Sequence, residues 1–310
     1  MKNMYNLKTV NENAKNPKEF IAEYEKKYDS TLKSFAVKTI EEKKKIILLT
    51  GPSGSGKTTT ALKLKDDFAA LGHSCVLISL DNFFKNKTEM PKDPMGKYEF
   101  EKLEALEIPL INQKLYELAS GKKTKLPYFD FNEGRRIDDA TEMELGNSIA
   151  IIEGIHAHNE SLREQLPNSE FIKLYISAHS GFENDGSIIL PKRDVRFCRR
   201  TLRDYFYRNS SFVNTCELWT KVIKDELLYV TPYSSKTDVR IDTTFPYEVG
   251  MFKDELIKIF SEIGENDIWY ERALYLKNIL SQFASYDKND LPDTSLITEF
   301  CGGGKFNYEQ

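Results

Sequence analysis

The sequence contains few of the features that mark secreted, zinc-binding or membrane-embedded chains. Its four cysteines lie far apart and form no CxxC pair, which argues against a zinc site or disulfide framework and for a reducing compartment. No apolar run reaches transmembrane length, and the N-terminus leads into no signal-peptide core. The net charge of −4 gives no sign of nucleic-acid binding. We therefore expect a cytoplasmic protein with neither a nucleic-acid nor a membrane partner.

Repeats and extended low-complexity segments are absent too, so nothing divides the chain into many units. With 310 residues and 40% hydrophobic content, it can bury a real core, and one α/β domain with appendages fits this length. We expect an N-terminal helical extension over residues 1–43, a central domain over 44–262 and a C-terminal helical extension over 263–310. A homo-oligomer is left open.

Short apolar runs alternate with helical patterns through the central domain. Such alternation predicts a mostly parallel sheet covered by helices on both faces, in three α/β/α layers. The runs that we interpret as strands cover residues 46–49, 75–80, 148–152, 171–176 and 239–241.

The segment before the first strand is divided into a polar end and an amphipathic helix. Residues 1–15 are polar and are expected to fray. Asn16 then has the character of a helix cap, Pro17 suits the first helical position, and Glu19 would complete a capping box. A second helical pattern beyond the central domain begins near residue 264.

One segment, Gly51–Thr58, is far more specific than the rest. It matches the phosphate-binding pattern G-x-x-x-x-G-K-[ST] and lies between a predicted strand and a predicted helix. The backbone N–H groups of such a loop point at one anion, and the helix N-terminus adds partial positive charge. We expect ATP here, with Lys57 on the β and γ phosphates and the Thr58 hydroxyl on Mg²⁺. The candidate nucleotide-binding residues are Gly51, Ser53, Gly54, Ser55, Gly56, Lys57, Thr58 and Thr59.

Two carboxylates directly follow predicted strands. The carboxyl ends of parallel strands form the ligand-binding edge of such a sheet. Asp81 could accept a proton from an attacking hydroxyl, or it could be a helix cap or a Mg²⁺ ligand. Glu153 could contact magnesium through water, or it could cap the next turn.

Arginines form an unusual stripe near residues 190–212. Arg193, Arg196, Arg200 and Arg203 share one helix face, with Arg199 and Arg208 close by. One arginine guanidinium can bind two phosphate oxygens at once and stays charged when desolvated. The stripe therefore indicates a lid over a triphosphate. A plain surface helix is the alternative.

Aromatic and acidic residues are dense in the long stretch between Asp81 and the strand at 148–152. The segments 98–101 and 127–136 could grip a flat polar acceptor, or they could form a β-hairpin with aromatic packing. His156 and His158 could line the same cleft.

Together these segments resemble the uridine kinase and phosphoribulokinase family of P-loop kinases, over roughly residues 44–262. The likeness is closest to a bacterial uridine kinase-like branch whose longer members carry an N-terminal TGS domain, absent here, and whose C-terminal signature matches Ser295–Gly304. The resemblance implies a P-loop NTPase fold of the nucleoside monophosphate kinase type and an ATP- and Mg²⁺-dependent kinase. It rests on Gly51–Thr58, Leu80–Phe84, Tyr98–Glu107, Leu126–Phe131, Ile152–Gly154 and Asp194–Asp204.

The resemblance also implies roles for individual residues. Asp81 matches the base for a ribose 5′-hydroxyl, and Glu101 matches an acid that holds sugar hydroxyls. The implied catalytic residues are Asp81, Lys57, Arg203 and Arg208, and the implied metal ligands are Thr58, Asp81 and Glu153. Arg199 joins the phosphate loop in nucleotide binding, and the implied substrate-binding residues are Phe100, Glu101, Phe129, Phe131, Arg136 and Arg200.

Two departures from the family pattern weaken the inference of a pyrimidine substrate. Gly134 stands where the eukaryotic pyrimidine enzymes have a base-reading histidine, and Ser210 replaces a second lid arginine. The expected reaction is phosphorylation of uridine or cytidine at the 5′-hydroxyl. Another acceptor, such as a sugar phosphate or a pantothenate-like or nicotinamide-riboside-like alcohol, stays open. A nucleotide-binding regulator is a third hypothesis, although neither an N-K-x-D nor an L-S-G-G-Q motif is present.

Overall fold

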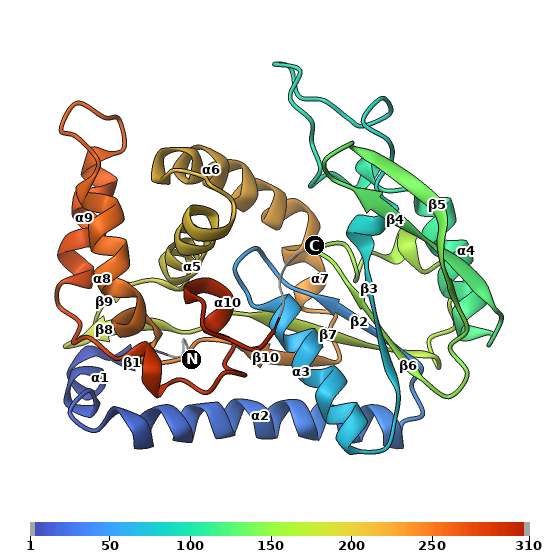
Figure 1. Cartoon of the computed structure of the whole chain (residues 1–310), viewed down its shortest axis with the longest axis horizontal. Coiled ribbons are helices and arrows are strands. Elements are labelled where there is room, and N and C mark those ends of the chain that lie inside the picture. The colour runs from blue at the N-terminus through green and yellow to red at the C-terminus, as the bar shows by residue number, and fades with distance from the viewer. Residues whose placement is uncertain (1–3, 307–310) are drawn as a thin grey trace.

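A five-stranded parallel sheet forms the centre of the computed structural model, which describes residues 4–306 (Figure 1). The strand order is β10-β7-β2-β6-β3, and every pairing is parallel. All five strands predicted from apolar runs are present, and the predicted three-layer α/β class is confirmed. The strands are β2 (Ile46–Thr50), β3 (Cys75–Ser79), β6 (Ile149–Glu153), β7 (Phe171–Ser177) and β10 (Val239–Asp242).

Alternate residues of each central strand enter two different cores. Ile47 and Leu49 of β2 face the larger core, while Ile46 and Leu48 face the smaller one. The larger core is covered by α2 (Pro17–Glu41), α3 (Lys57–Ala70), α5 (Lys192–Tyr207), α8 (Glu248–Ser261) and α9 (Tyr270–Leu280). The smaller core is covered by α4 (Ile108–Ala119) and the antiparallel hairpin of β4 (Thr124–Asp130) and β5 (Arg135–Met143).

The N-terminal segment is ordered where the structure describes it. β1 (Met4–Asn6) pairs with β8 (Gly181–Asn184), and β8 pairs in turn with β9 (Ser187–Leu190). The helix α1 (Leu7–Asn13) directly follows β1. The prediction of a frayed end is therefore wrong for residues 4–15. Asn16 does precede α2 and Pro17 does open it, but the Asn16 side chain makes no capping hydrogen bond, so the expected capping box does not form.

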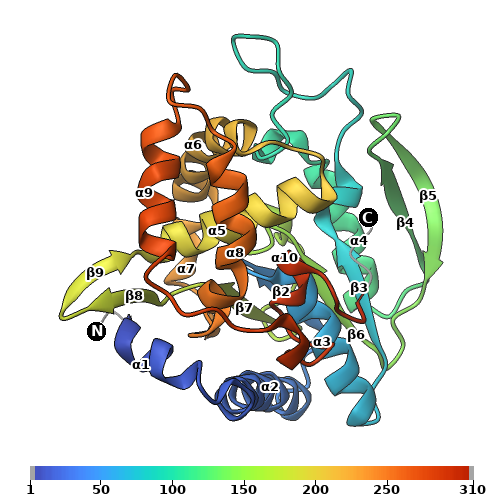
Figure 2. The same ribbon diagram turned by 60° about the vertical axis from the view of Figure 1, so that its left-hand side comes forward.

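The C-terminal segment returns to the centre of the molecule. After α9 the chain runs back toward the start of α3, where α10 (Thr298–Cys301) packs against α5 (Figure 2). Leu296, Ile297 and Phe300 are buried in the larger core. This segment is therefore part of the fold around the sheet edge and not a loose appendage.

The remaining helices connect these parts. They are α6 (Phe212–Tyr229) and α7 (Thr231–Ser234), with a short 3₁₀ turn, η1 (Leu80–Phe83), directly after β3. All four cysteines are free. Within residues 4–306, no helix combines the length and the apolar character needed to cross a bilayer.

Candidate functional site

The glycines of the phosphate loop occupy positions that a side chain would disturb. Gly56 precedes α3 with a φ of 83°, in the left-handed region that favours glycine. A Cβ atom on Gly51 would approach the Ile176 carbonyl oxygen to 2.1 Å. The loop between β2 and α3 is therefore held tightly against β7, with its backbone curled around the N-terminus of α3.

The loop borders a cavity of about 280 Å³ at the carboxyl edge of the sheet. Most of the predicted site residues, which are scattered over some 150 positions of sequence, meet around it. Its lining includes Ser53, Gly54, Ser55, Gly56, Lys57, Thr58, Asp81, Phe100, Glu101, Phe131, Glu153, Arg200, Arg203 and Arg208. Five predicted residues lie outside the lining: Gly51, Thr59, Phe129, Arg136 and Arg199.

Lys57 lies between the phosphate loop and the carboxyl end of β6. Its Nζ atom donates to the Gly51 carbonyl oxygen at 3.1 Å and lies 3.8 Å from Glu153 Oε1. Glu153 ends β6, and Asp81 lies in η1 after the neighbouring strand β3. The helix-cap alternative for Asp81 is not what the structure shows, because Ser79 is the N-cap of η1 and accepts from the Asp81 N–H.

Burial makes the Asp81 carboxyl unusually basic. Desolvation, followed by repulsion from Glu153 and Glu101, raises its pKa to about 7. Burial also raises the pKa of Glu153, against the opposing effect of Lys57. A carboxyl group with a pKa near neutrality can both accept and release a proton at physiological pH, which is the property required of a general base.

The arginine stripe on α5 divides into two groups. Arg200, Arg203 and Arg208 line the cavity, and the first two point guanidinium nitrogens at Ser53 Oγ, at 2.8 and 3.4 Å. Arg193 is exposed. Arg196 donates to the Ser53 carbonyl oxygen at 3.1 Å and pairs with Glu226. The stripe therefore supplies charge to the cavity at one end and grips the loop at the other.

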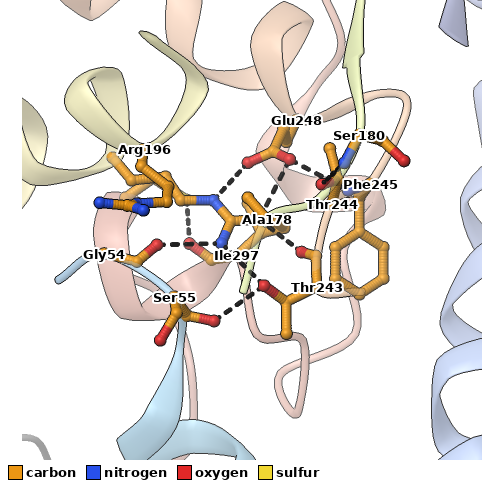
Figure 3. Close-up of polar contacts among 12 residues, drawn as sticks. Gly54, Ser55, Ala178, Ser180, Arg196, Thr243, Thr244, Phe245, Glu248 and Ile297 are labelled. Atoms are coloured by element: carbon orange, nitrogen blue, oxygen red, sulfur yellow. Dashed lines mark hydrogen bonds and ion pairs between the residues drawn. The ribbon is translucent and has the colours of Figure 1, made fainter. Parts of the chain in front are cut away.

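Arg199 is completely buried and has no free edge to offer a nucleotide. Its guanidinium donates to both oxygens of Glu248, at 2.6 and 3.0 Å, and to the Gly54 carbonyl oxygen at 3.1 Å. Thr243 joins this network and donates to the Ser55 carbonyl oxygen at 2.8 Å (Figure 3). This arrangement favours a role in holding the loop over the direct nucleotide contact that we predicted.

The residues predicted to hold the acceptor are also divided. Phe100, Glu101 and Phe131 line the cavity. Phe129 is buried behind them, with its ring 5.0 Å from that of Phe131, and belongs to the smaller core. Arg136 lies opposite Phe129 in the hairpin, where it pairs with Asp138 at 2.7 Å and donates to the Phe84 carbonyl oxygen at 3.4 Å, and it is not among the residues that line the cavity.

The two histidines after Glu153 form structural hydrogen bonds. His156 lines the cavity, but its Nε2 bonds the Glu101 carbonyl oxygen at 2.9 Å. His158 bonds the Leu48 carbonyl oxygen at 2.9 Å. Burial lowers the pKa of each ring to about 4, so both are neutral at physiological pH.

Two unpaired donors beside the cavity fit an anionic ligand. Ser55 Oγ and Arg203 Nε are buried and have no hydrogen-bond partner among the described residues. Buried polar atoms are normally paired, so unpaired donors beside a phosphate loop fit bound phosphate.

The oxygen atoms of Thr58, Asp81 and Glu153 around the same cavity suit Mg²⁺, which prefers oxygen ligands. Residues 4–306 contain no group of three or more metal-binding side chains. A magnesium ion bound through phosphates and water, with only one or two protein ligands, fits both observations.

Sequence reasoning missed three charged residues that line the cavity, Asp225 and Glu226 of α6 and Glu299 of α10. Glu299, in α10, lines it beside Arg203, with 3.6 Å between Glu299 Oε1 and Arg203 Nη1. The residue lies within the Ser295–Gly304 signature, which was the available signal. Because no strand or helix periodicity links that segment to the phosphate loop, the pattern could not place it in space.

Comparisons with known proteins agree with this site. The family model described as "Phosphoribulokinase / Uridine kinase family" matches residues 46–247. A uridine kinase from Schizosaccharomyces pombe is 34% identical over 185 residues, covering 59% of this chain and 36% of that protein. One from Saccharomyces cerevisiae is 28% identical over 199 residues, covering 63% and 36%.

A bacterial uridine kinase, from Lactobacillus helveticus, is 28% identical over 214 residues, covering 65% of this chain and 92% of that protein. The match thus spans about a third of the length of the two yeast relatives and nearly all of the bacterial one. The family model covers more than half of this chain, from the first central strand to the loop beyond the last. The chain belongs to the phosphoribulokinase and uridine kinase family.

Proposed function

We propose that this protein is an ATP-dependent kinase that phosphorylates the hydroxyl group of a small molecule, with the 5′-hydroxyl of uridine or cytidine as the acceptor. The observation that carries this proposal is the meeting of three groups at one cavity. These are a phosphate loop with Lys57, a carboxyl group with a pKa near neutrality at Asp81, and an aromatic and acidic wall formed by Phe100, Glu101 and Phe131.

In this proposal Asp81 accepts the proton of the acceptor hydroxyl while that oxygen forms a bond to the γ-phosphorus. The bond between the γ-phosphorus and the bridging oxygen breaks, and ADP leaves with the electron pair. Lys57, Arg200 and Arg203 place positive charge where negative charge develops in the transition state. Such positioning and electrostatic stabilisation account for most of what phosphoryl transfer requires.

Magnesium would be held by Thr58 and Glu153, and when bound it neutralises phosphate charge and orients the transferred group. Asp81 lies in the adjoining turn and could contribute either as base or as ligand. Lys57 stays within 3.8 Å of Glu153, so the cation and the lysine would share this acidic edge of the cavity.

The acceptor assignment rests on the wall opposite the phosphate loop. Glu101 offers a carboxylate to a ribose diol, and Phe100 and Phe131 offer ring faces and edges to a planar base. The relatives described as uridine kinases support this choice by likeness. Phe129 and Arg136 are no longer proposed as acceptor contacts, since Phe129 belongs to the smaller core and Arg136 is bound to Asp138 and the Phe84 carbonyl oxygen outside the cavity lining.

The alternative acceptor, another alcohol, is favoured by Gly134. This glycine lies in the turn of the hairpin with a φ of 64°, and a Cβ atom there would meet the Lys87 side chain at 2.2 Å. The position therefore cannot carry a base-reading side chain without moving Lys87. Selection of the base should be weaker than selection of the sugar.

A substrate panel tests the proposal. Purified protein with ATP and Mg²⁺ would be offered uridine, cytidine, adenosine, ribulose 5-phosphate, pantothenate and nicotinamide riboside, and phosphorylated products would be identified by mass spectrometry. We expect product with the pyrimidine nucleosides. Product only with another compound would leave the kinase and remove the pyrimidine acceptor, whereas acceptor-independent ATP hydrolysis alone would contradict both.

A further inference from the structure

Residues 291–306, here called the C-terminal turn, lie directly on the phosphate loop and on the first turn of α3 (Figure 2). Leu296 packs so closely over Gly56 that a Cβ atom on that glycine would come within 2.5 Å of it. Phe300 lies with its ring centroid 5.1 Å from the Arg199 guanidinium carbon. The turn thus touches both the loop and the arginine that grips the loop.

Glu299 makes the contact with the most direct chemical meaning. Its Oε2 atom accepts hydrogen bonds from the Thr59 hydroxyl at 2.7 Å and from the Thr59 N–H at 3.3 Å. Thr59 lies in the first turn of α3, where free N–H groups and the helix dipole favour an anion. A carboxylate of this chain therefore takes up donors that we assign to a nucleotide phosphate.

The same carboxylate also takes up a cavity arginine. Glu299 Oε1 lies 3.6 Å from Arg203 Nη1, and Glu299 is almost completely buried. A triphosphate bound at the loop would bring several negative charges next to this carboxylate. Like charges at about 4 Å repel by roughly 1 kcal/mol in water and more in a partly buried site, so Glu299 and a bound donor compete for one position.

The size of the cavity agrees with this competition. A kinase must hold a nucleoside triphosphate and an acceptor at once, and ligand pockets commonly measure roughly 300–1,000 Å³. The cavity of about 280 Å³ lies at the lower end of that range. Withdrawal of Glu299, which lines it, would widen it on the side of the loop.

The C-terminal turn is held by polar contacts as well as by apolar packing. Lys63 donates to the Thr294 carbonyl oxygen at 2.9 Å, and Lys305 pairs with Asp66 at 2.9 Å on the surface. The exposed Lys305–Asp66 pair is of a type that contributes about 0–1 kcal/mol, whereas Lys63 is buried. Ser295 also bonds the buried Glu25 of α2, and Leu296, Ile297 and Phe300 pack in the larger core, so displacing the turn breaks this apolar packing as well.

We propose that the C-terminal turn is an autoinhibitory latch, in which Glu299 occupies an anion-binding position of the donor site and is displaced when a donor nucleotide binds. Glu299 thereby sets the affinity for the donor. This inference rests on the proposed nucleotide site, and it concerns the binding of the donor alone, before any acceptor is present.

Glu299→Gln is the sharpest test, since glutamine keeps the shape and removes the charge. Binding of ATP·Mg²⁺ would be measured by calorimetry for the wild type, Glu299→Gln and the matched control Glu262→Gln, an exposed glutamate at the end of α8. The apparent Kd equals the intrinsic Kd divided by the open fraction, so a latch that is open about a tenth of the time predicts roughly tenfold tighter binding in Glu299→Gln. Glu262→Gln should bind as the wild type does.

Hydrogen exchange of the wild type separates a moving latch from simple charge repulsion. If the latch is displaced, ATP·Mg²⁺ should speed amide exchange in residues 291–306 while slowing it in residues 51–60. Unchanged or slower exchange in 291–306 would overturn the proposal. Weaker ATP binding by Glu299→Gln would do so as well, and would make Glu299 a positioning residue for Arg203.

The variant Lys57→Ala keeps this result apart from that of the proposed function. If the wild type, Glu299→Gln and Lys57→Ala all fail to bind ATP, the assignment of the donor site itself is wrong. If the wild type binds ATP, Lys57→Ala does not, and Glu299→Gln shows no gain, only the latch is wrong.

Discussion

Lys57 is the side chain on which the donor half of the site depends. It bridges the Gly51 carbonyl oxygen and Glu153, so its ammonium group lies at the mouth of the loop. Lys57→Ala should lower kcat by about 10²–10³-fold, the usual loss when one transition-state contact is removed. Steady-state kinetics would measure the loss, and a thermal melt would show that the fold survives. A folded variant with near-normal kcat would contradict the assignment of the loop.

The raised pKa of Asp81 predicts how activity depends on pH. A general base works only when ionised, and burial together with Glu153 and Glu101 raises the pKa of Asp81 to about 7. We therefore expect kcat/KM for the acceptor to fall as the pH drops below 7. Magnesium favours the carboxylate, so the inflection should lie lower with the metal bound.

Asp81→Asn supplies the control, because an amide cannot accept the proton. Its kcat should fall by about 10²-fold or more, and the inflection near neutrality should vanish. A profile that keeps the inflection would assign it to another group. An equal loss of ATP affinity and kcat would make Asp81 a metal ligand first.

The same pKa also predicts a change in stability. The pKa of Asp81 is higher in the folded state, about 7, than its ordinary value of 3.8, so the folded state favours the neutral carboxyl. Its contribution to stability is full below pH 3.8 and is lost as the pH rises through 7. Thermal melts at pH 5 and pH 8 should therefore show Asp81→Asn gaining Tm relative to the wild type at the higher pH. A difference in Tm that does not change with pH would contradict this.

At the scale of elements, α5 couples the phosphate loop to α8. Arg199 of α5 and Glu248 of α8 form a completely buried ion pair, and the same guanidinium bonds the Gly54 carbonyl oxygen. Removing one partner leaves the other charge buried alone, at a cost of about 3–5 kcal/mol. Arg199→Met should therefore lower the free energy of unfolding by that amount.

The double variant Arg199→Met with Glu248→Leu checks the cause. Replacing both charges with apolar groups should restore much of the stability, because a buried pair and its apolar equivalent often differ little. Urea denaturation of the two variants measures this. If nucleotide affinity fell while stability stayed normal, Arg199 would contact the nucleotide directly, as first predicted.

Element types were well predicted wherever the pattern reflects local physics. The apolar runs that became β2, β6 and β7 are buried on both faces, so continuous hydrophobic sequence was a sufficient signal. The loop Gly51–Thr58 was recognisable because its backbone geometry demands glycine at fixed positions. The prediction of a frayed N-terminus was wrong for residues 4–15 because β1 is ordered by pairing with β8, 177 residues away, and no local pattern reports such a pairing.

Site residues were predicted most directly where they follow the ends of parallel strands. Asp81 and Glu153 follow β3 and end β6, and the topology of a parallel sheet brings those ends together. Arg136 lies on the same face of the hairpin as Phe129 but is bound by Asp138 and the Phe84 carbonyl oxygen, and no sequence pattern reports those contacts. Glu299 depends on the path of a long C-terminal return, which sequence periodicity does not encode.

At the scale of the whole molecule, each of the two cores supports a different wall of the cavity. The larger core supports the phosphate loop and α5, while the smaller core supports η1, Phe84 and the aromatic wall. Donor binding and acceptor choice therefore depend on different halves of the fold. Substitutions in the aromatic wall should change acceptor kinetics and leave ATP affinity nearly intact.

Discrimination between ribose and deoxyribose tests that division. Glu101 is the carboxylate of the acceptor wall, and a buried group built to bond a hydroxyl is left unpaired when the hydroxyl is missing, at a cost of about 1–3 kcal/mol. We expect kcat/KM for 2′-deoxyuridine to be roughly 10- to 100-fold below that for uridine. In Glu101→Ala most of this preference should disappear, because uridine loses the contact that deoxyuridine never made.

Glu104→Ala is the matched control for that experiment, since Glu104 is exposed on the neighbouring turn and lies outside the cavity lining. It should keep the wild-type ratio between the two nucleosides. Affinity for ATP, measured in the absence of acceptor, should be the same in all three proteins because the donor site is supported by the other core. If Glu101→Ala lowered activity toward both nucleosides equally, Glu101 would be acting on Asp81 and not on the sugar. Such an outcome would move the choice of acceptor to the rings of Phe100 and Phe131.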